Sequence, residues 1–123
     1  EVIALLDKIK PPYNINQATQ ELALKALEQT EQLAYMIEEI VQEREMLTHA
    51  LPTLDVVEKV YPSDANFLLV KVKEANRLYT YLLDKGIVVR NRASLPGCEG
   101  CLRISIGTVD ENQQLFQAIS NFK

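Results

Sequence analysis

Residues 86–108 read GIVVRNRASLPGCEGCLRISIGT, and they contain two apolar runs joined by a loop. The first run, residues 87–90, follows a glycine and is rich in β-branched side chains, which favour strands. The second run, residues 102–106, alternates between apolar and polar side chains, as a strand does when only one of its faces is buried. We therefore predict two strands, 87–90 and 102–106, with a loop over 91–100 between them.

Two arginines on these strands are candidates for binding an anion. The alternation places Arg103 on the face opposite the apolar side chains of its own strand, and Arg90 shares a face with Val88. If the strands are adjacent or near-adjacent, both guanidinium groups reach one site, where their forked donors suit a carboxylate or a phosphate. An ordinary surface position is equally well supported for Arg90, whereas the apolar neighbours of Arg103 favour a covered, functional position.

The rest of the chain predicts helices segregated beside a small sheet. Apolar residues recur at helical spacing over 17–51, with a break expected at 28–31 and a stop at Pro52. Strands are expected over 56–61 and 66–73, a helix over 74–85 that closes at Gly86, and a last helix from Asp110. The order αα-ββ-α-β-β-α indicates an α+β fold. We expect about four largely antiparallel strands with helices packed on one face, which leaves the other face in need of cover.

Composition excludes several classes of function. The chain has 123 residues, is 47% apolar and carries a net charge of −4 with acidic and basic residues intermixed, which is typical of one compact domain and unfavourable for nucleic-acid binding. No apolar run reaches the roughly 20 residues of a membrane span, and residues 1–10 do not resemble a cleavable leader. We expect a soluble, cytoplasmic protein with no membrane partner. Residues 1–9 have the pattern of the end of a helix without a start signal, so we expect the chain to be part of a longer protein, with a short native helix as the alternative.

No self-contained active site is predicted. Cys98 and Cys101 form a CxxC pair, but they are the only cysteines and supply at most half of a four-cysteine zinc site, so chance spacing in a loop is the favoured interpretation and no metal is expected. The sequence shows no glycine-rich phosphate loop and no serine or cysteine in a nucleophile motif.

Three stretches nevertheless carry a family resemblance: KPPYNIN at 10–16, PSDANF at 62–67, and GIVVR with GCLRISIGT within 86–108. In order and spacing they resemble the C-terminal third of histidinol-phosphate aminotransferases, which are fold-type I enzymes that use pyridoxal phosphate. The resemblance covers essentially the whole chain. It implies that residues 1–16 are the end of a preceding helix with a proline-rich interdomain segment, and that 17–123 form the C-terminal small domain.

The resemblance also implies an activity and a set of site residues. Such enzymes transfer an amino group between glutamate and imidazole acetol phosphate in histidine biosynthesis, as homodimers whose substrates include histidinol phosphate and 2-oxoglutarate. Arg103 would then hold the anionic end of the substrate and Arg90 would assist at the phosphate. Tyr13 and Asn14 are expected near the domain junction, the dimer interface and the mouth of the active site. Asn66 would either approach the pocket or only satisfy a turn.

What the family needs beyond these residues is missing from the sequence. None of the lysines follows the serine-rich motif of the cofactor lysine, and the aspartate and phosphate cradle of the cofactor would lie in the missing large domain. We therefore expect no catalytic residue and no bound cofactor in this chain, and no activity from it alone. The small domain of a threonine-phosphate decarboxylase or an aromatic aminotransferase remains an alternative, as does a non-catalytic anion-binding α+β module.

Overall fold

A computed structural model describes residues 2–9 and 15–123, and the chain divides into two compact units. The first unit, Glu1–Tyr35, contains the helices α1 (Val2–Ile9) and α2 (Gln17–Glu28) and the beginning of α3 (Thr30–Ala50). The second unit, Met36–Lys123, contains the rest of α3 and all the strands. The predicted domain boundary between residues 16 and 17 concerns a longer protein and stays a prediction.

The long helical stretch is interrupted where the polar residues predicted a break. Gln29 separates α2 from α3, and its backbone N–H bonds to the last turn of α2. Asn16 caps the start of α2, because its side chain accepts a hydrogen bond from the Thr19 N–H at 2.9 Å. Pro52 lies in the 3-10 turn η1 (Leu51–Thr53), which ends α3. None of the described helices combines the length and apolar character needed to cross a membrane.

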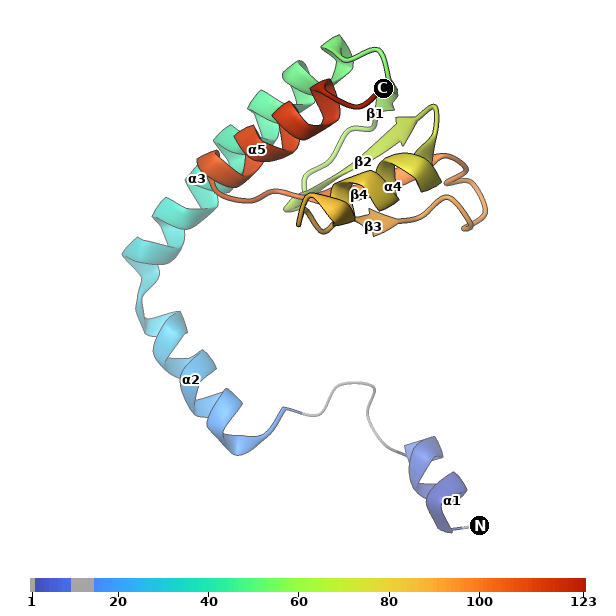
Figure 1. The fold of residues 1–123 in the computed structure, drawn as a ribbon. Coiled ribbons are helices and arrows are strands. Elements are labelled where there is room, and N and C mark those ends of the chain that lie inside the picture. The colour runs from blue at the N-terminus through green and yellow to red at the C-terminus, as the bar shows by residue number, and fades with distance from the viewer. Residues whose placement is uncertain (1, 10–14) are drawn as a thin grey trace. The chain divides into compact units, whose positions relative to one another are not determined.

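The second unit is built on a four-stranded antiparallel sheet, which confirms the predicted α+β fold. Its strands are β1 (Val57–Val60), β2 (Phe67–Val72), β3 (Arg90–Asn91) and β4 (Cys101–Ser105), in the spatial order β1-β2-β4-β3 (Figure 1). The consecutive strands β1 and β2 pair as an antiparallel hairpin, whereas β4 lies between β2 and β3.

Helices α3, α4 (Ala75–Asp84) and α5 (Val109–Ser120) pack against one face of this sheet. The side chains of β2 and β4 alternate, so that those on the helix side are buried and most of those on the other side are not. Figure 1 shows α5 running alongside α3. No helix of the second unit packs on the opposite face. The most deeply buried apolar side chains of this single core are Leu47, Leu51, Leu68, Val70, Leu78, Leu82, Leu102 and Ile104.

Helix α4 closes at Gly86, as predicted. Gly86 has φ +77°, a left-handed conformation that favours glycine, and its N–H bonds to the Leu83 carbonyl at 2.9 Å. The Ile87 N–H bonds to the Leu82 carbonyl at 2.8 Å, and the two bonds together make a Schellman cap.

The strand that follows this cap is shorter than predicted. We expected it over residues 87–90, but β3 contains only Arg90–Asn91. Residues 87–89 precede β3 without a partner strand among the described residues, so their β-branched side chains do not suffice to make a strand. The strand prediction for 87–89 is therefore wrong for this chain, and the reason is the lack of a neighbour.

Candidate anion-binding site

Arg90 and Arg103 are brought together by the register of the sheet. They are direct partners in the antiparallel pair of β3 with β4, so their side chains project from the same face. This is the face on which no helix of the second unit packs. Val89 is buried while Val88 and Arg90 are exposed, which agrees with the predicted alternation. The adjacency expected from the sequence is thus present, and a shared ligand stays a prediction.

Arg103 has the geometry of an arginine prepared for a ligand. The centre of its guanidinium lies 4.2 Å from the ring centroid of Phe67, on β2. Stacking on an aromatic face orients the plane of the guanidinium and leaves its N–H edge available. Its Nε atom is buried and has no hydrogen-bond partner among the described residues, which costs free energy unless another group supplies an acceptor. Phe67 was not predicted as a site residue, although it lies in the PSDANF stretch.

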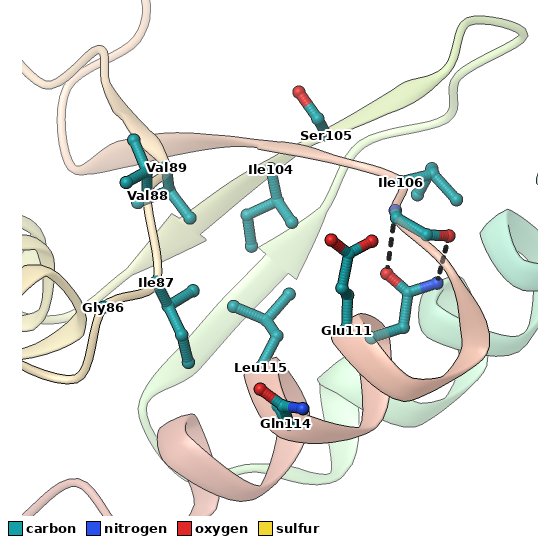
Figure 2. Close-up of a pocket in the computed structure, with 12 residues that line it drawn as sticks. Gly86, Ile87, Val88, Val89, Ile104, Ser105, Ile106, Glu111, Gln114 and Leu115 are labelled. Carbon is teal, nitrogen blue, oxygen red and sulfur yellow. Dashed lines mark hydrogen bonds between the residues drawn. The ribbon is translucent and has the colours of Figure 1, made fainter.

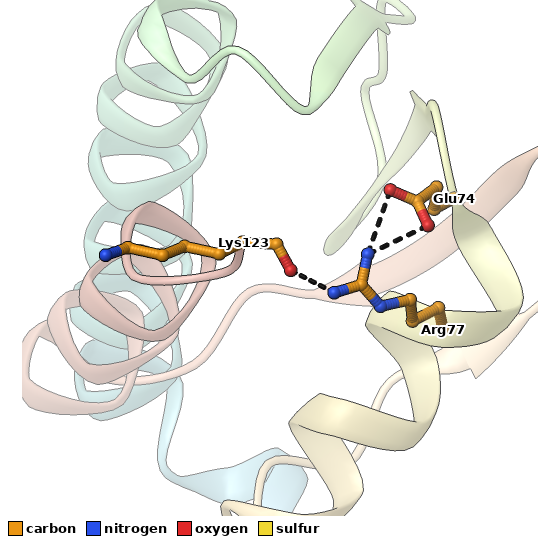
Figure 3. Close-up of polar contacts among 3 residues, drawn as sticks. All are labelled: Glu74, Arg77 and Lys123. Carbon is orange, nitrogen blue, oxygen red and sulfur yellow. Dashed lines mark hydrogen bonds and ion pairs between the residues drawn. The ribbon is translucent and has the colours of Figure 1, made fainter.

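Arg77, in contrast, is an arginine whose guanidinium is hydrogen-bonded within the protein. Arg77 donates two hydrogen bonds to the Glu74 carboxylate, at 3.0 and 3.1 Å, and another to the main-chain carbonyl of Lys123 (Figure 3). Its guanidinium also lies 4.8 Å from the ring centroid of Phe122. Arg77 therefore ties α4 to the end of the chain, and its charge is paired with Glu74.

The two lysines on the same sheet face have protein partners. Lys71 pairs with Glu58 at 3.6 Å, and Lys59 lies 4.6 Å from the ring centroid of Tyr61. Neither Arg90 nor Arg103 forms an ion pair within the part of the chain that the structure describes. Two like charges directly opposite each other on a sheet repel, so an anion bound between them would relieve that repulsion.

The turn before β2 is held by Ser63 rather than by Asn66. The Ser63 hydroxyl donates to the Phe67 carbonyl at 2.6 Å and accepts from the Ala65 N–H at 3.2 Å. The Asn66 side chain is exposed and makes no hydrogen bond within the described residues, while its main-chain carbonyl accepts from the Ile106 N–H at 2.9 Å. The turn therefore does not use the Asn66 side chain, and its approach to a pocket stays a prediction.

A buried asparagine fixes the loop that follows β4. Asn112, which is 2% exposed, accepts from the Gly107 N–H at 3.0 Å and donates to the Gly107 carbonyl at 3.0 Å (Figure 2). Its amide also donates to Glu43 of α3 at 2.8 Å. The sequence analysis missed this residue. The signal was present, because Asn112 lies at helical spacing from the buried Leu115 and Ile119.

The start of α5 is closed by a capping box. Thr108 caps the helix, and its backbone N–H donates to Glu111 Oε2 at 2.8 Å. This bond, together with one from the Thr108 hydroxyl, lowers the pKa of Glu111 below its ordinary value of 4.5. An added Cβ at Gly107 would lie 2.6 Å from Glu111 Oε2, so a side chain there would require the Glu111 carboxylate of the capping box to move.

A pocket of about 370 Å³ opens beside the ends of β4 and the 86–89 segment (Figure 2). One wall is the segment 86–89, the other is the end of β4 and Gly107, and the start of α5 forms the floor. Ile87, Ile104 and Leu115 supply apolar surface. No arginine or lysine lines this pocket, so it is separate from the arginine pair.

The described residues do not fit the part of a cofactor site that carries the lysine. Of the lysines in 2–9 and 15–123, only Lys71 is partly buried, and it pairs with Glu58. The Cys101 thiol is buried, and burial raises its pKa, which disfavours the reactive thiolate. No group of three or more His, Cys, Asp or Glu side chains that could hold a metal is present in the described ranges. Tyr13 and Asn14 lie outside the described residues.

Comparison with known proteins decides the family. The family model described as "Aminotransferase class I and II" matches residues 1–119, nearly the whole chain. The chain belongs to this aminotransferase family. The class I and II aminotransferases as a family imply pyridoxal phosphate as the cofactor of the full-length protein.

Curated relatives in this family are considerably longer than the chain. The histidinol-phosphate aminotransferase of Flavobacterium psychrophilum is 51% identical over 118 residues, which are 96% of this chain and 34% of the relative. The chain thus spans about a third of the length of the curated relatives it matches.

Solved aminotransferase-family structures confirm the fold. The histidinol-phosphate aminotransferase of Clostridium acetobutylicum superimposes with a TM-score of 0.77 at 24% identity, over 95% of this chain and 36% of that one. At that identity the likeness shows the fold alone. The L-threonine-O-3-phosphate decarboxylase of Porphyromonas gingivalis has a TM-score of 0.63 at 27% identity, over 69% of this chain and 27% of that one.

Proposed function

We propose that the full-length protein is a histidinol-phosphate aminotransferase, which transfers an amino group between glutamate and imidazole acetol phosphate. The observation that carries the proposal is the direct pairing of Arg90 with Arg103 on a sheet face where no helix of the second unit packs. Neither guanidinium group has an ion-pair partner among the described residues. Both substrates of that reaction carry anionic groups, a carboxylate or a phosphate. The name shared by the curated relatives, at up to 51% identity, supports this choice.

The role of this chain in the reaction is to bind and orient the substrates. Arg103, stacked on Phe67, presents a guanidinium of fixed plane, and its N–H edge matches a carboxylate or a phosphate in a bidentate manner. Arg90, across the strand pair, adds a second positive charge that suits the doubly charged phosphate. One site can therefore accept both substrates in turn.

The remaining parts of the enzyme lie outside this chain in our proposal. Pyridoxal phosphate, when bound by the large domain, would supply the electron sink for amino transfer. We further propose a homodimer, with Tyr13 and Asn14 near the domain junction and the mouth of the site. The cytoplasmic location expected from the sequence is part of the same proposal.

The test is an assay of the purified full-length protein with histidinol phosphate and 2-oxoglutarate. We expect glutamate to form in proportion to histidinol phosphate consumed, and the 123-residue chain alone to be inactive. If the folded, cofactor-loaded full-length protein forms no glutamate in this assay, the proposal is excluded.

A threonine-phosphate decarboxylase is the second candidate, because the Porphyromonas gingivalis structure of that name shares this fold at 27% identity. Its substrate also carries a carboxylate and a phosphate. Release of carbon dioxide from threonine phosphate, without amino transfer to 2-oxoglutarate, would favour this candidate. Amino transfer from phenylalanine in preference to histidinol phosphate would instead indicate an aromatic aminotransferase, and anion binding without turnover would indicate a non-catalytic module.

A further inference from the structure

The loop between β3 and β4 consists of three consecutive β-turns. At each turn a main-chain N–H bonds to the carbonyl three residues earlier, from Leu95 to Arg92 at 2.9 Å, from Cys98 to Leu95 at 3.0 Å and from Cys101 to Cys98 at 2.9 Å. At the base of the loop, the Arg92 N–H bonds to the Cys101 carbonyl at 3.0 Å. The two ends of the loop are therefore joined to each other, and main-chain bonds define the conformation between them.

The last of these turns has a cysteine at each of its ends, Cys98 and Cys101. Gly100 occupies the third position of the turn with φ +74°, the left-handed conformation that a type II turn requires there. The Cα atoms at the two ends of a β-turn lie within about 7 Å of each other. A disulfide joins Cα atoms that are roughly 4.4–6.8 Å apart, so the turn holds the two cysteines at the range that a disulfide needs.

The two thiols differ in how well they can react with a solute. Cys98 is half-buried, whereas Cys101 is 1% exposed and its thiol lies 3.9 Å from the Glu99 carbonyl. Burial raises the pKa of Cys101, and the nearby Cys98 raises it further, because two neighbouring thiolates repel each other. Cys98 is therefore the thiol that a dissolved reagent meets first, and Cys101 is the thiol that can react second.

The cysteine pair lies on the sheet face that carries the two arginines. Side chains alternate along β4, so Cys101 projects from the same face as Arg103, two residues further on. Across the strand pair with β2, the partner of Cys101 is Lys71, whose ammonium group pairs with Glu58 at 3.6 Å. A chemical change at the two cysteines would therefore take place beside the candidate anion-binding site.

We propose that Cys98 and Cys101 are a modification site, which closes reversibly to a disulfide by exchange with a small-molecule disulfide of the glutathione class. This proposal replaces chance spacing, the interpretation favoured from the sequence. The Cys98 thiolate attacks one sulfur of the small disulfide, which forms a mixed disulfide and releases one thiolate of the small molecule. Cys101 then loses its proton to solvent and attacks the Cys98 sulfur, which releases the second thiolate. The protein dithiol is thus oxidised while one small disulfide is reduced to two thiols.

The test is to incubate the full-length protein with oxidised glutathione and to weigh the tryptic peptide that contains the turn. Trypsin cleaves after Arg92 and after Arg103, so residues 93–103 form one peptide with both cysteines. The reaction is quenched with acid, and the remaining thiols are blocked with iodoacetamide in the unfolded protein. We expect a peptide that is two hydrogens lighter than the reduced form and carries neither blocking group nor glutathione. A peptide blocked at both cysteines, or one that keeps glutathione, would overturn the proposal.

Single substitutions test the order of the two steps. Cys101→Ser is expected to accumulate glutathione on Cys98, because the second thiol is missing. Cys98→Ser is expected to take up glutathione on Cys101 at least about 10-fold more slowly, because that thiol is buried. Cys101→Ala repeats the first experiment without a hydroxyl at the buried position, so that a folding defect in one variant does not decide the result. Equal rates of uptake at the two cysteines would overturn the assignment of Cys98 as the first nucleophile.

The equilibrium with glutathione shows whether the folded turn prepares the disulfide. We expect the equilibrium constant for closure to be at least about 10-fold larger in the folded protein than in the isolated peptide 93–103. Gly100→Ala should lower the constant of the folded protein, because φ +74° strains alanine and its Cβ would lie 3.2 Å from the Val72 carbonyl oxygen. Gly86→Ala is the matched control, since Gly86 has φ +77° at the end of α4. Equal constants for the protein and the peptide, or for the two glycine variants, would overturn the proposal.

Discussion

Arg90 and Arg103 are direct partners across β3 and β4, and the guanidinium of Arg103 lies over the ring of Phe67 on the next strand. The sheet thereby places two positive charges side by side on the face where no helix of the second unit packs. The two charges repel each other, and a bound anion would offset that repulsion. Neither arginine has an ion-pair partner in the described part of the chain, unlike Arg77. The predictions below separate a binding role of this pair from a structural one.

Arg103→Lys in the full-length enzyme is expected to raise KM for both amino-group donors, glutamate and histidinol phosphate, by about 10- to 100-fold. A lysine keeps the charge but cannot form the two parallel bonds of the guanidinium, and a hydrogen bond to a charged group contributes about 1.5–3 kcal/mol. Steady-state kinetics with each substrate gives the values. Arg77→Lys is the matched control, because the hydrogen bonds and the ring contact of Arg77 within the described residues are with Glu74, Phe122 and Lys123. An unchanged KM for both substrates would contradict a substrate-binding role for Arg103.

Arg90→Gln is expected to weaken binding of the phosphorylated substrate more than binding of glutamate. A phosphate carries close to two negative charges at neutral pH, so it gains more from the second cation than a carboxylate does. The measurement is the ratio of kcat/KM for histidinol phosphate to that for glutamate, which should fall by about 5-fold or more. An equal loss for both substrates would remove the phosphate assignment.

The arginine pair shows which features of the candidate site can be predicted from the sequence and which cannot. Alternation along 102–106 was enough to place Arg103 away from the core, and the β-branched run before Arg90 was enough to suggest a neighbouring strand. The register that makes them direct partners, and the ring of Phe67 beneath Arg103, depend on contacts between strands distant in sequence. Periodicity within one strand carries no information on such contacts.

Phe67→Leu is expected to raise KM by about 2- to 5-fold for both substrates, while Phe67→Tyr leaves KM nearly unchanged. Leucine keeps apolar bulk at this position but removes the aromatic face, and a cation–π contact contributes about 0.5–2 kcal/mol depending on exposure. Melting temperatures of the two variants control for effects on the core. If leucine and tyrosine give the same KM, the ring does not orient Arg103.

The strand prediction for residues 87–89 is wrong for a different reason. Their side chains favour a strand, but a strand also needs a neighbour to accept its main-chain bonds, and the described residues provide none. Asn112 was missed because a buried asparagine looks like a surface residue until its partners, Gly107 and Glu43, are known. Both cases show that local preference is overridden where a segment's partners lie far away in the chain.

Asn112→Ala is expected to destabilise this chain by about 2–4 kcal/mol. The change removes both bonds to Gly107 and the one to Glu43, and it leaves buried polar groups without partners. Chemical denaturation measures the loss. The control is Asn121→Ala, which removes an exposed asparagine at the other end of α5 that bonds only to the Gln117 carbonyl. Equal, small losses for both variants would show that the Gly107 contact contributes little.

The capping box of α5 is expected to make stability depend on pH through Glu111. Hydrogen bonds from Thr108 lower the pKa of Glu111 in the folded state below its ordinary value of 4.5, so the folded protein binds the proton less readily than the unfolded chain does. The stabilisation by the carboxylate is therefore fully present above about pH 4.5 and is lost as pH falls through the lower, folded pKa.

The measurement compares the unfolding of this chain with that of Glu111→Gln between pH 7 and pH 3. The variant should be less stable at neutral pH, and the difference should shrink as the pH falls, because protonation removes the charge from the native residue too. Glu45→Gln makes the same change at an exposed position of α3 and controls for the loss of one negative charge. A difference between Glu111→Gln and the unsubstituted chain that stays constant down to pH 3 would show that the ionised carboxylate does not stabilise the cap.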